Sequence, residues 1–369
     1  MSRVSPLIFQ PIFKPKIWGG RRLETAVHKT LDTAEPVGES WELADLENDQ
    51  SVVRTGPAKG KTLGGLVREW GADLLGHTPL FEGRFPLLIK FLDANANLSV
   101  QVHPDEKMAK RLGGNVRVKN EAWFILHAEP GGSIYRGFVD GVTRESFIAA
   151  IEAGTSASLL RRIPVKSGQC YYLPSGTIHA LGAGVVVAEV QTPSDITYRV
   201  YDWDRVDPKT GVGRDLHIAE ALECINFGDC NDGQPARSHV ASVWTSVTQL
   251  VRCDSFVIER VRMAEGVEPP FGSGEFMVWV VLEGDGEILY KGGEPVRFSP
   301  GDTVLLPAGL EDARVRTLAD CMWLEVSIPL PSDLAEYPRL ERSQLAQPGD
   351  SGFVQLNVEN HPGAEGSRG

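Results

Sequence analysis

The sequence contains little cysteine, no long apolar run and no excess of positive charge. Its five cysteines are an odd number without CxxC spacing, which argues against a disulfide framework and favours reduced thiols. No run reaches the ~18 apolar residues of a membrane-spanning helix. The first ten residues lack the basic start and apolar core of a signal peptide. We therefore expect a cytoplasmic protein.

The charge balance narrows the range of partners. A net charge of −12 and a pI of about 5.2 disfavour nucleic acid and anionic membranes as partners. The sequence has no Gly-x4-Gly-Lys-Ser/Thr loop, so no nucleotide binding is implied. A small anionic substrate stays compatible, because a few local cations are enough to bind a phosphate group. The oligomeric state is left open.

The pattern along the chain is mainly β, with a few short helices. Helices are expected at 62–70 and 143–153, where a threonine precedes an apolar stripe of helical spacing. Short runs of strand character follow one another elsewhere, at 42–44, 51–54, 87–92, 98–103, 121–126, 169–173, 184–191 and across 243–328. A polar stretch at 228–238 reads as a linker. The expected division is 1–230, 240–330 and a partly disordered extension at 331–369.

An internal repeat suggests that the two units are related. Gly168-x5-Pro174-x-Gly176-x2-His179 recurs as Gly301-x5-Pro307-x-Gly309-x2-Asp312. Glu121 and its strand similarly resemble the run that starts at Glu275. The second copy has an aspartate in place of the histidine and no Gln-x-His before Glu275. We therefore expect two similar β-barrels, of which the second is metal-free and structural.

Three residues of the first unit form a candidate metal-ligand set. His103, Glu121 and His179 together offer two imidazoles and a carboxylate, a common set for Zn²⁺ or Fe²⁺. Gln101 shares a strand face with His103 and could add a neutral oxygen. The Pro-x-Gly turn before His179 would direct this histidine into a barrel mouth.

These segments resemble a known family. The Pro174-x-Gly176-x2-His179 element is a cupin signature, and Gln101-x-His103-Pro104-x resembles the metal-binding signature of type I phosphomannose isomerases. Lys119-x-Glu121 and the run from Ala188 to Trp203 are similar too. The resemblance covers residues 6–330 and is closest to the short bacterial form of the family. The chain lacks the helical insertion that longer members carry. It implies two cupin-type jelly-roll β-barrels, the first of them catalytic.

The resemblance also implies roles for individual residues. One zinc ion per chain would be held by Gln101, His103, Glu121 and His179. Arg199 would be the essential arginine, and Glu189 and Lys119 match positions implicated in catalysis. The positions expected near a sugar-phosphate substrate are Lys90, Ser99 and Trp18.

The implied reaction interconverts mannose 6-phosphate and fructose 6-phosphate by proton transfer through an enediol. It requires stabilisation of oxygen charge and a base over the carbon face. Zinc and Arg199 would supply the first, and Glu189, or alternatively Lys119, would carry the proton. Structural roles stay open, since Glu189 could face solvent and Arg199 could only pair with Asp195 or Asp202.

Two other functional classes fit parts of the pattern. An iron-dependent cupin oxygenase would use the same two histidines and carboxylate, but such enzymes place His-x-His in the first motif, where this chain has Gln101. A non-catalytic sugar-binding cupin needs a pocket but no cluster such as Lys119, Glu189 and Arg199.

Overall fold

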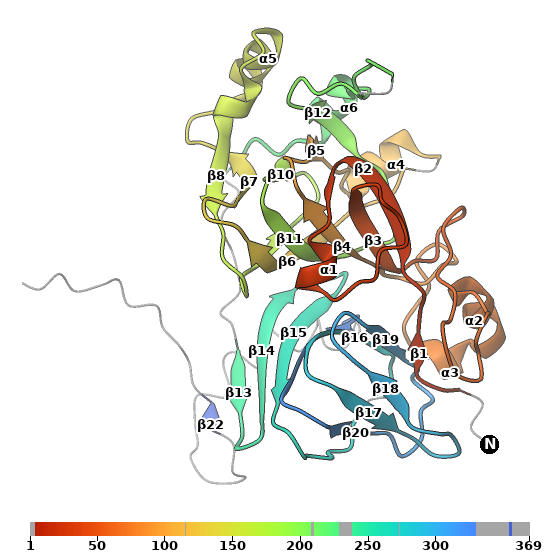
Figure 1. Cartoon of the computed structure of the whole chain (residues 1–369). Helices are drawn as coiled ribbons and strands as arrows, with labels where there is room; N and C mark the ends of the chain where they lie inside the picture. Colours follow the sequence, from red (N-terminus) through yellow and green to blue (C-terminus); the bar gives the residue numbers. More distant parts are fainter. Residues whose placement is uncertain are drawn as a thin grey trace, which may run out of the picture.

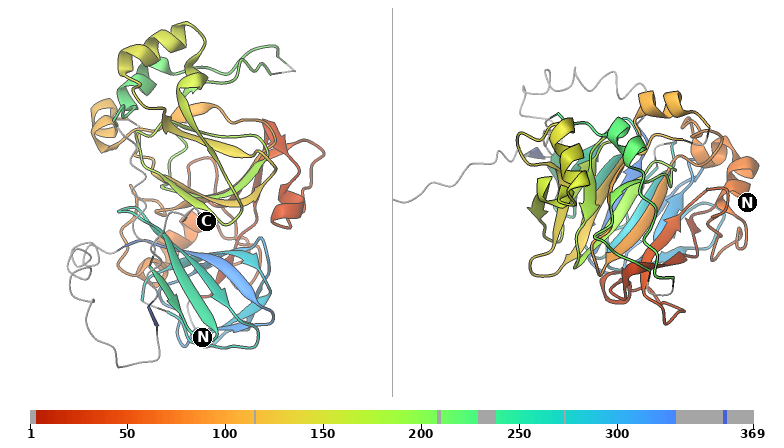
Figure 2. Two further views of the ribbon diagram at one scale, coloured as in Figure 1. Left: turned by 90° about the vertical axis from the view of Figure 1, so that its left-hand side faces the viewer. Right: turned by 90° about the horizontal axis from the view of Figure 1, so that it is seen from above.

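The structure is a computed structural model that describes residues 4–114, 116–207, 210–228, 238–272 and 274–329, and the backbone of 354–355. It is mainly β and is built from two β-sandwiches that pack against each other through their larger sheets, with the short helices at the periphery (Figures 1 and 2). No helix of the described residues is long and apolar enough to cross a membrane. The linker expected at 228–238 lies almost wholly outside the described residues, as does the extension at 331–369 except 354–355.

The N-terminal barrel packs a six-stranded sheet against a five-stranded one. The six-stranded sheet has the order β2-β3-β4-β11-β6-β9, with strands Ile12–Gly20, Val37–Leu43, Leu88–Ala94, Val185–Gln191, Glu121–Ala128 and Cys170–Leu173. The five-stranded sheet has the order β12-β5-β10-β7-β8, with strands Tyr198–Tyr201, Val100–Val102, His179–Leu181, Ser133–Phe138 and Leu160–Pro164.

The C-terminal barrel repeats this arrangement with an eight-stranded and a three-stranded sheet. The first has the order β1-β19-β16-β21-β15-β14-β13-β22, with strands Leu7–Ile8, Thr303–Leu306, Met277–Glu283, Cys321–Ser327, Val257–Met263, Thr245–Arg252, His239–Ala241 and Val354–Gln355. The second has the order β18-β17-β20, with strands Val296–Phe298, Gly286–Leu289 and Arg314–Thr317. The N-terminal strand β1 therefore belongs to the sheet of the C-terminal barrel.

The helices are short, and two of them confirm sequence predictions. In α2 (Leu63–Trp70) the Thr62 side chain accepts from an amide of the first turn, and Thr143 and Ser146 form a reciprocal capping box at α5 (Arg144–Glu152). The others are α1 (Leu23–Ala26), α3 (Ala72–Leu75), α4 (Glu106–Leu112), α6 (Ile218–Cys224) and the 3₁₀ turn η1 (Ser156–Leu159).

Two strand predictions need correction. The strand expected at 98–103 is β5, which covers only Val100–Val102, because His103 turns out of the sheet into the loop before α4. The stretch 51–54 forms isolated bridges, Phe9 with Val53 and Val52 with Thr62, in place of a strand. The runs 87–92, 121–126, 169–173 and 184–191 are strands as predicted.

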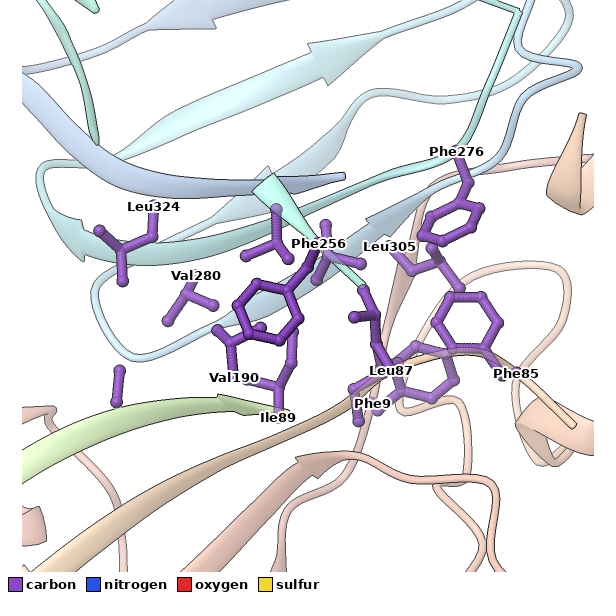
Figure 3. Close-up of a cluster of buried hydrophobic side chains, with 14 of the residues drawn as sticks. Phe9, Phe85, Leu87, Ile89, Val190, Phe256, Phe276, Val280, Leu305 and Leu324 are labelled. Carbon is purple, nitrogen blue, oxygen red and sulfur yellow. The ribbon is translucent and has the colours of Figure 1, made fainter. Parts of the chain in front are cut away.

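One apolar core joins the two barrels. Ile89 and Val190 of β4 and β11 contribute to it from the N-terminal barrel, and Val280 and Leu324 of β16 and β21 from the C-terminal barrel (Figure 3). Phe85 meets Phe276 with ring centroids 4.8 Å apart. Because all of these side chains are buried, separating the barrels would expose a large apolar area, at roughly 25 cal/mol per Å².

A polar contact extends this junction to a strand that carries candidate site residues. Asn120 stands between Lys119 and Glu121, and its amide donates to Ser255 Oγ in the C-terminal barrel at 3.1 Å. Its carbonyl oxygen accepts from Ser175 N at 3.0 Å. The C-terminal barrel therefore supports the start of β6.

Candidate active site

The candidate residues come from two rows of paired strand residues that face each other inside the N-terminal barrel. In the six-stranded sheet, Lys90 of β4, Glu189 of β11 and Trp123 of β6 are register partners. In the five-stranded sheet, Arg199 of β12, Gln101 of β5 and His179 of β10 are register partners. Since alternate residues of a strand share a face, Glu121 points the same way as Trp123.

The predicted metal ligands meet at one buried point. His179 Nε2 lies 2.8 Å from one oxygen of Glu121, and His103 Nε2 lies 3.5 Å from the other. The Gln101 amide is 3.3 Å from His179 Nε2. One ligand atom from each of His103, Glu121 and His179 falls within 4.8 Å of the others. The structure thus brings together all four residues predicted from sequence.

The donor geometry fits a cation. His179 Nδ1 lies 2.8 Å from the carbonyl oxygen of Thr177; donation to that oxygen leaves a lone pair on Nε2, which faces the Glu121 carboxylate. Two lone pairs in contact repel unless a cation lies between them. Neither Glu121 oxygen completes a well-directed hydrogen bond, although the residue is fully buried. A backbone carbonyl that orients a histidine is also a common partner in metal sites.

Electrostatics favour the ligand forms of these side chains. Burial and the Lys119 charge lower the pKa of His103 to about 3, so its imidazole is neutral. Burial alone would raise the pKa of Glu121, but the charge of Lys119 outweighs it and holds this pKa well below its usual range. Lys119 Nζ is 2.7 Å from Glu121 Oε2 and 3.1 Å from His103 Nε2.

Glu189 is buried beside the metal-ligand cluster, so it does not face solvent. Its Oε2 accepts from Trp123 Nε1 at 2.8 Å, and Lys90 Nζ is 3.7 Å from Oε1. Burial and the charge of Glu121 raise the pKa of Glu189, against the opposing charges of Lys119 and Lys90. A carboxylate of raised pKa is suited to accept a proton.

Lys90 is enclosed by carboxylates. Its Nζ lies 3.5 Å from Asp195, 3.7 Å from Glu189 and 3.8 Å from Glu39, and 4.5 Å from the centroid of the Trp41 ring. Burial opposes the charge of Lys90, but the surrounding carboxylates outweigh it and raise its pKa. Burial likewise raises the pKa of Glu39, but Lys90 and Lys16 outweigh it and lower this pKa to about 2.

Arg199 pairs with neither Asp195 nor Asp202. Its Nη1 donates to the carbonyl oxygen of Asp215 at 2.7 Å, and its buried Nε has no partner. Burial and the charge of Arg214 lower the pKa of Arg199. Among the described residues, no carboxylate lies within ion-pair distance of its guanidinium group, which leaves its charge free for a ligand.

Lys90, Lys119, Glu189, Arg199 and Gln101 line one cavity of about 280 Å³, close to the lower end of the range for small-molecule sites. Ser99 and Trp18, both buried, line it as the resemblance implied. Sequence reasoning assigned no role to several other lining residues. Thr197 could have been found from its i, i+2 spacing to Arg199, whereas Arg214 follows a loop without periodicity. The lining residues with no predicted role are Leu92, Leu98, Thr197 and Arg214, whereas Lys16 and Glu39 belong to segments that the resemblance places in the pocket wall.

The fold and the site together define a class: a two-barrel cupin with a buried His-Glu-His ligand set beside a cationic, carboxylate-containing cavity. The family model for the phosphomannose isomerase type I catalytic domain matches residues 7–134, and that for the EutQ-like cupin domain matches 270–323. The chain belongs to the type I phosphomannose isomerase family.

Known proteins of similar sequence and structure match this chain over most of its length. Mannose-6-phosphate isomerase ManA of Bacillus subtilis is 36% identical over 321 residues, which is 86% of this chain and 98% of the relative. A mannose-6-phosphate isomerase of Streptococcus mutans is 36% identical over 302 residues, 82% of this chain and 92% of the relative. A solved Bacillus subtilis mannose 6-phosphate isomerase matches with a TM-score of 0.79 and 33% identity, covering 88% of this chain and all of that one.

Proposed function

We propose that this chain interconverts mannose 6-phosphate and fructose 6-phosphate as a zinc-dependent cytoplasmic enzyme. The observation that carries the proposal is that one cavity is lined by Glu189, Lys90 and Arg199. Gln101 and Lys119 line the same cavity and contact the buried cluster of His103, Glu121 and His179. The membership in the phosphomannose isomerase family and the names of the relatives support this substrate.

The donor set fits Zn²⁺, with Gln101, His103, Glu121 and His179 as its ligands. Bound there, the ion supplies a Lewis acid for the oxygens at C1 and C2 of the sugar. Thr177 orients His179 through its carbonyl oxygen, and Lys119 keeps Glu121 ionised. These two contacts hold the ligands in the form that binds a cation.

The proton transfer is assigned to Glu189. Its carboxylate takes the proton from C2 of the aldose and returns it to C1, while the hydroxyl proton passes from O2 to O1. The buried environment that raises the pKa of Glu189 makes it a stronger base, and Trp123 fixes its orientation. Lys119, next to the metal ligands, is the alternative proton carrier.

Arg199 contributes positive charge to the substrate cavity, since its guanidinium group lines this cavity without a carboxylate partner. Lys90 donates to the sugar from the same cavity, Ser99 contributes a hydroxyl, and the Trp18 ring forms part of the wall.

The decisive experiment is an isomerisation assay on protein of known metal content. We expect turnover of mannose 6-phosphate that a chelator abolishes and one equivalent of zinc restores. Turnover that persists after complete metal removal would contradict the metal assignment. Absence of turnover in the zinc-loaded protein would contradict the substrate assignment.

A further inference from the structure

The cavity has two chemically different ends. At one end Lys90 is surrounded by Glu39, Glu189 and Asp195, so its charge is already balanced and a dianion would meet three carboxylates there. At the other end Arg199 and Arg214 line the wall, and the Arg199 guanidinium donates to no carboxylate. Lys16 and Lys119, which also line the cavity, are paired with Glu39 and Glu121, so among the described residues the excess of positive charge lies toward the arginine end.

The arginine end is built by the segment after β12. Asp202 is buried and binds Arg214 through two hydrogen bonds of 2.6 and 2.8 Å, and Arg205 through one of 2.7 Å. The same segment is bound to β12, because His217 N donates to the Arg199 carbonyl oxygen at 2.8 Å. Two arginines thus share one buried carboxylate beside a third, Arg199, and the Nε atoms of Arg199 and Arg205 are buried without partners.

We infer that Arg214, held in place by Asp202, forms with Arg199 the site that binds the phosphate group of the substrate. This inference rests on the proposed function and assigns a specificity role to Arg214 and a positioning role to Asp202. Guanidinium groups bind phosphate oxygens through paired, charge-assisted hydrogen bonds.

The dimensions agree with this placement. Arg199 and His179 are separated by one strand in the five-stranded sheet, since both are register partners of Gln101. Two strand spacings correspond to about 10 Å. A hexose 6-phosphate carries its reacting carbons and its phosphate at opposite ends. The metal ligands and Glu189 can therefore face C1 and C2 while the arginines hold the phosphate group.

The chain offers a matched control. Arg205 shares Asp202 with Arg214 and carries the same charge, but it does not line the cavity. Arg214→Gln and Arg205→Gln remove the same charge from the same ion-pair partner. A larger loss of affinity in Arg214→Gln than in Arg205→Gln therefore indicates that Arg214 contacts the ligand. An equal loss would indicate only a change in the stability of the segment or in its overall positive charge.

The test measures binding of mannose 6-phosphate and of inorganic phosphate by calorimetry on zinc-loaded protein, beside steady-state kinetics. We expect Arg214→Gln to weaken both affinities and raise KM about 10- to 100-fold, with kcat changed less than about threefold. Asp202→Asn should reproduce the loss in part, and Arg205→Gln should leave both affinities within about twofold of wild type.

Each outcome decides the inference. Equal losses in Arg214→Gln and Arg205→Gln, no loss in either, or a wild-type protein that binds neither anion would overturn it. Binding is read without turnover, so wild-type protein that binds phosphate through Arg214 but fails to isomerise mannose 6-phosphate would refute the proposed function and leave this anion site supported.

Discussion

The two barrels of this chain share one architecture but differ in the residues that face their interiors. Glu121 and Leu173 are register partners in the N-terminal barrel, and Met277 and Leu306 occupy the matching places in the C-terminal barrel. The match is confirmed by a second contact: Trp123 Nε1 donates to Glu189, and Trp279 Nε1 donates to Glu325, each at 2.8 Å. The repeat seen in the sequence is therefore structural.

This alignment corrects one equivalence suggested by the sequence. Met277, two residues beyond Glu275, stands in the place of Glu121. Glu275 instead accepts hydrogen bonds from the backbone amides of His77 and Thr78 in the N-terminal half of the chain. The sequence comparison matched two glutamates, whereas the register partner across the sheet decides which residue points inward.

The differences show what the chemistry requires. The C-terminal barrel keeps the Trp-Glu pair, but Met277 stands in the place of Glu121. Glu259 stands in the place of Lys90, because it is the register partner of Glu325 as Lys90 is of Glu189. Asp312 is exposed with φ 51°, whereas His179 is buried. The rings of Trp279 and Trp323 stack with their centroids 4.6 Å apart inside the C-terminal barrel. The same scaffold thus forms a packed core when the ligands and the balancing lysine are replaced.

The largest expected effect comes from giving the N-terminal barrel the aspartate that the C-terminal barrel has in place of His179. His179→Asp should abolish zinc binding and lower turnover by more than about 100-fold, the upper end for residues that only support a metal ligand. Metal analysis and the isomerase assay measure both. The reverse change, Asp312→His, should add no metal, because Met277 replaces the carboxylate; a second equivalent of zinc would contradict the comparison.

The paired glutamates offer the next contrast. Glu189→Gln should retain zinc and lower kcat by about 10²- to 10⁴-fold, since the amide cannot accept the substrate proton. Glu325→Gln, the matching change in the C-terminal barrel, should leave kcat unaltered. Near-normal turnover of Glu189→Gln would move the proton transfer to Lys119.

The buried Glu39 and the half-buried Glu259, one in each barrel, should respond to pH in opposite ways. Glu39 has a folded-state pKa lowered to about 2, so its stabilising contribution is complete above the pKa of the unfolded chain and disappears as the pH falls toward 2. Glu39→Gln should lower the free energy of unfolding by about 2 kcal/mol at pH 7. Chemical denaturation at pH 7 and pH 4 should show that most of this penalty persists at pH 4.

Glu259 should show the opposite sign and a smaller effect. Burial raises its pKa despite the nearby charge of Arg252, so the folded protein favours the protonated acid, and this contribution is lost as the pH rises above the pKa of the unfolded chain. Glu259→Gln should therefore stabilise the protein at pH 7 by about 0.5–1 kcal/mol. The gain should shrink below pH ~4, where the acid is protonated in both states. The exposed Glu265→Gln serves as the control, and a loss of stability in Glu259→Gln would contradict the argument.

The cluster of His103, Glu121 and His179 could be predicted from sequence because its motifs are local. Gln101 and His103 are two residues apart at the end of β5, and a Pro-x-Gly turn precedes His179. The cavity next to this cluster could not be predicted from sequence, because its lining depends on which strands pair. Lys90 meets Glu39 and Glu189 only through the order β3-β4-β11, and Arg214 reaches the cavity only because Asp202 anchors it. The division into 1–230 and 240–330 remains a proposal, and the N-terminal strand β1 crosses it by pairing with β19.

The most direct test of the central claim is anomalous diffraction at the zinc edge from crystals of the zinc-loaded protein. The account predicts one peak per chain, within bonding distance of His103, Glu121 and His179 in the N-terminal barrel. A peak beside Met277 and Asp312, or no peak between the two histidines, would contradict it.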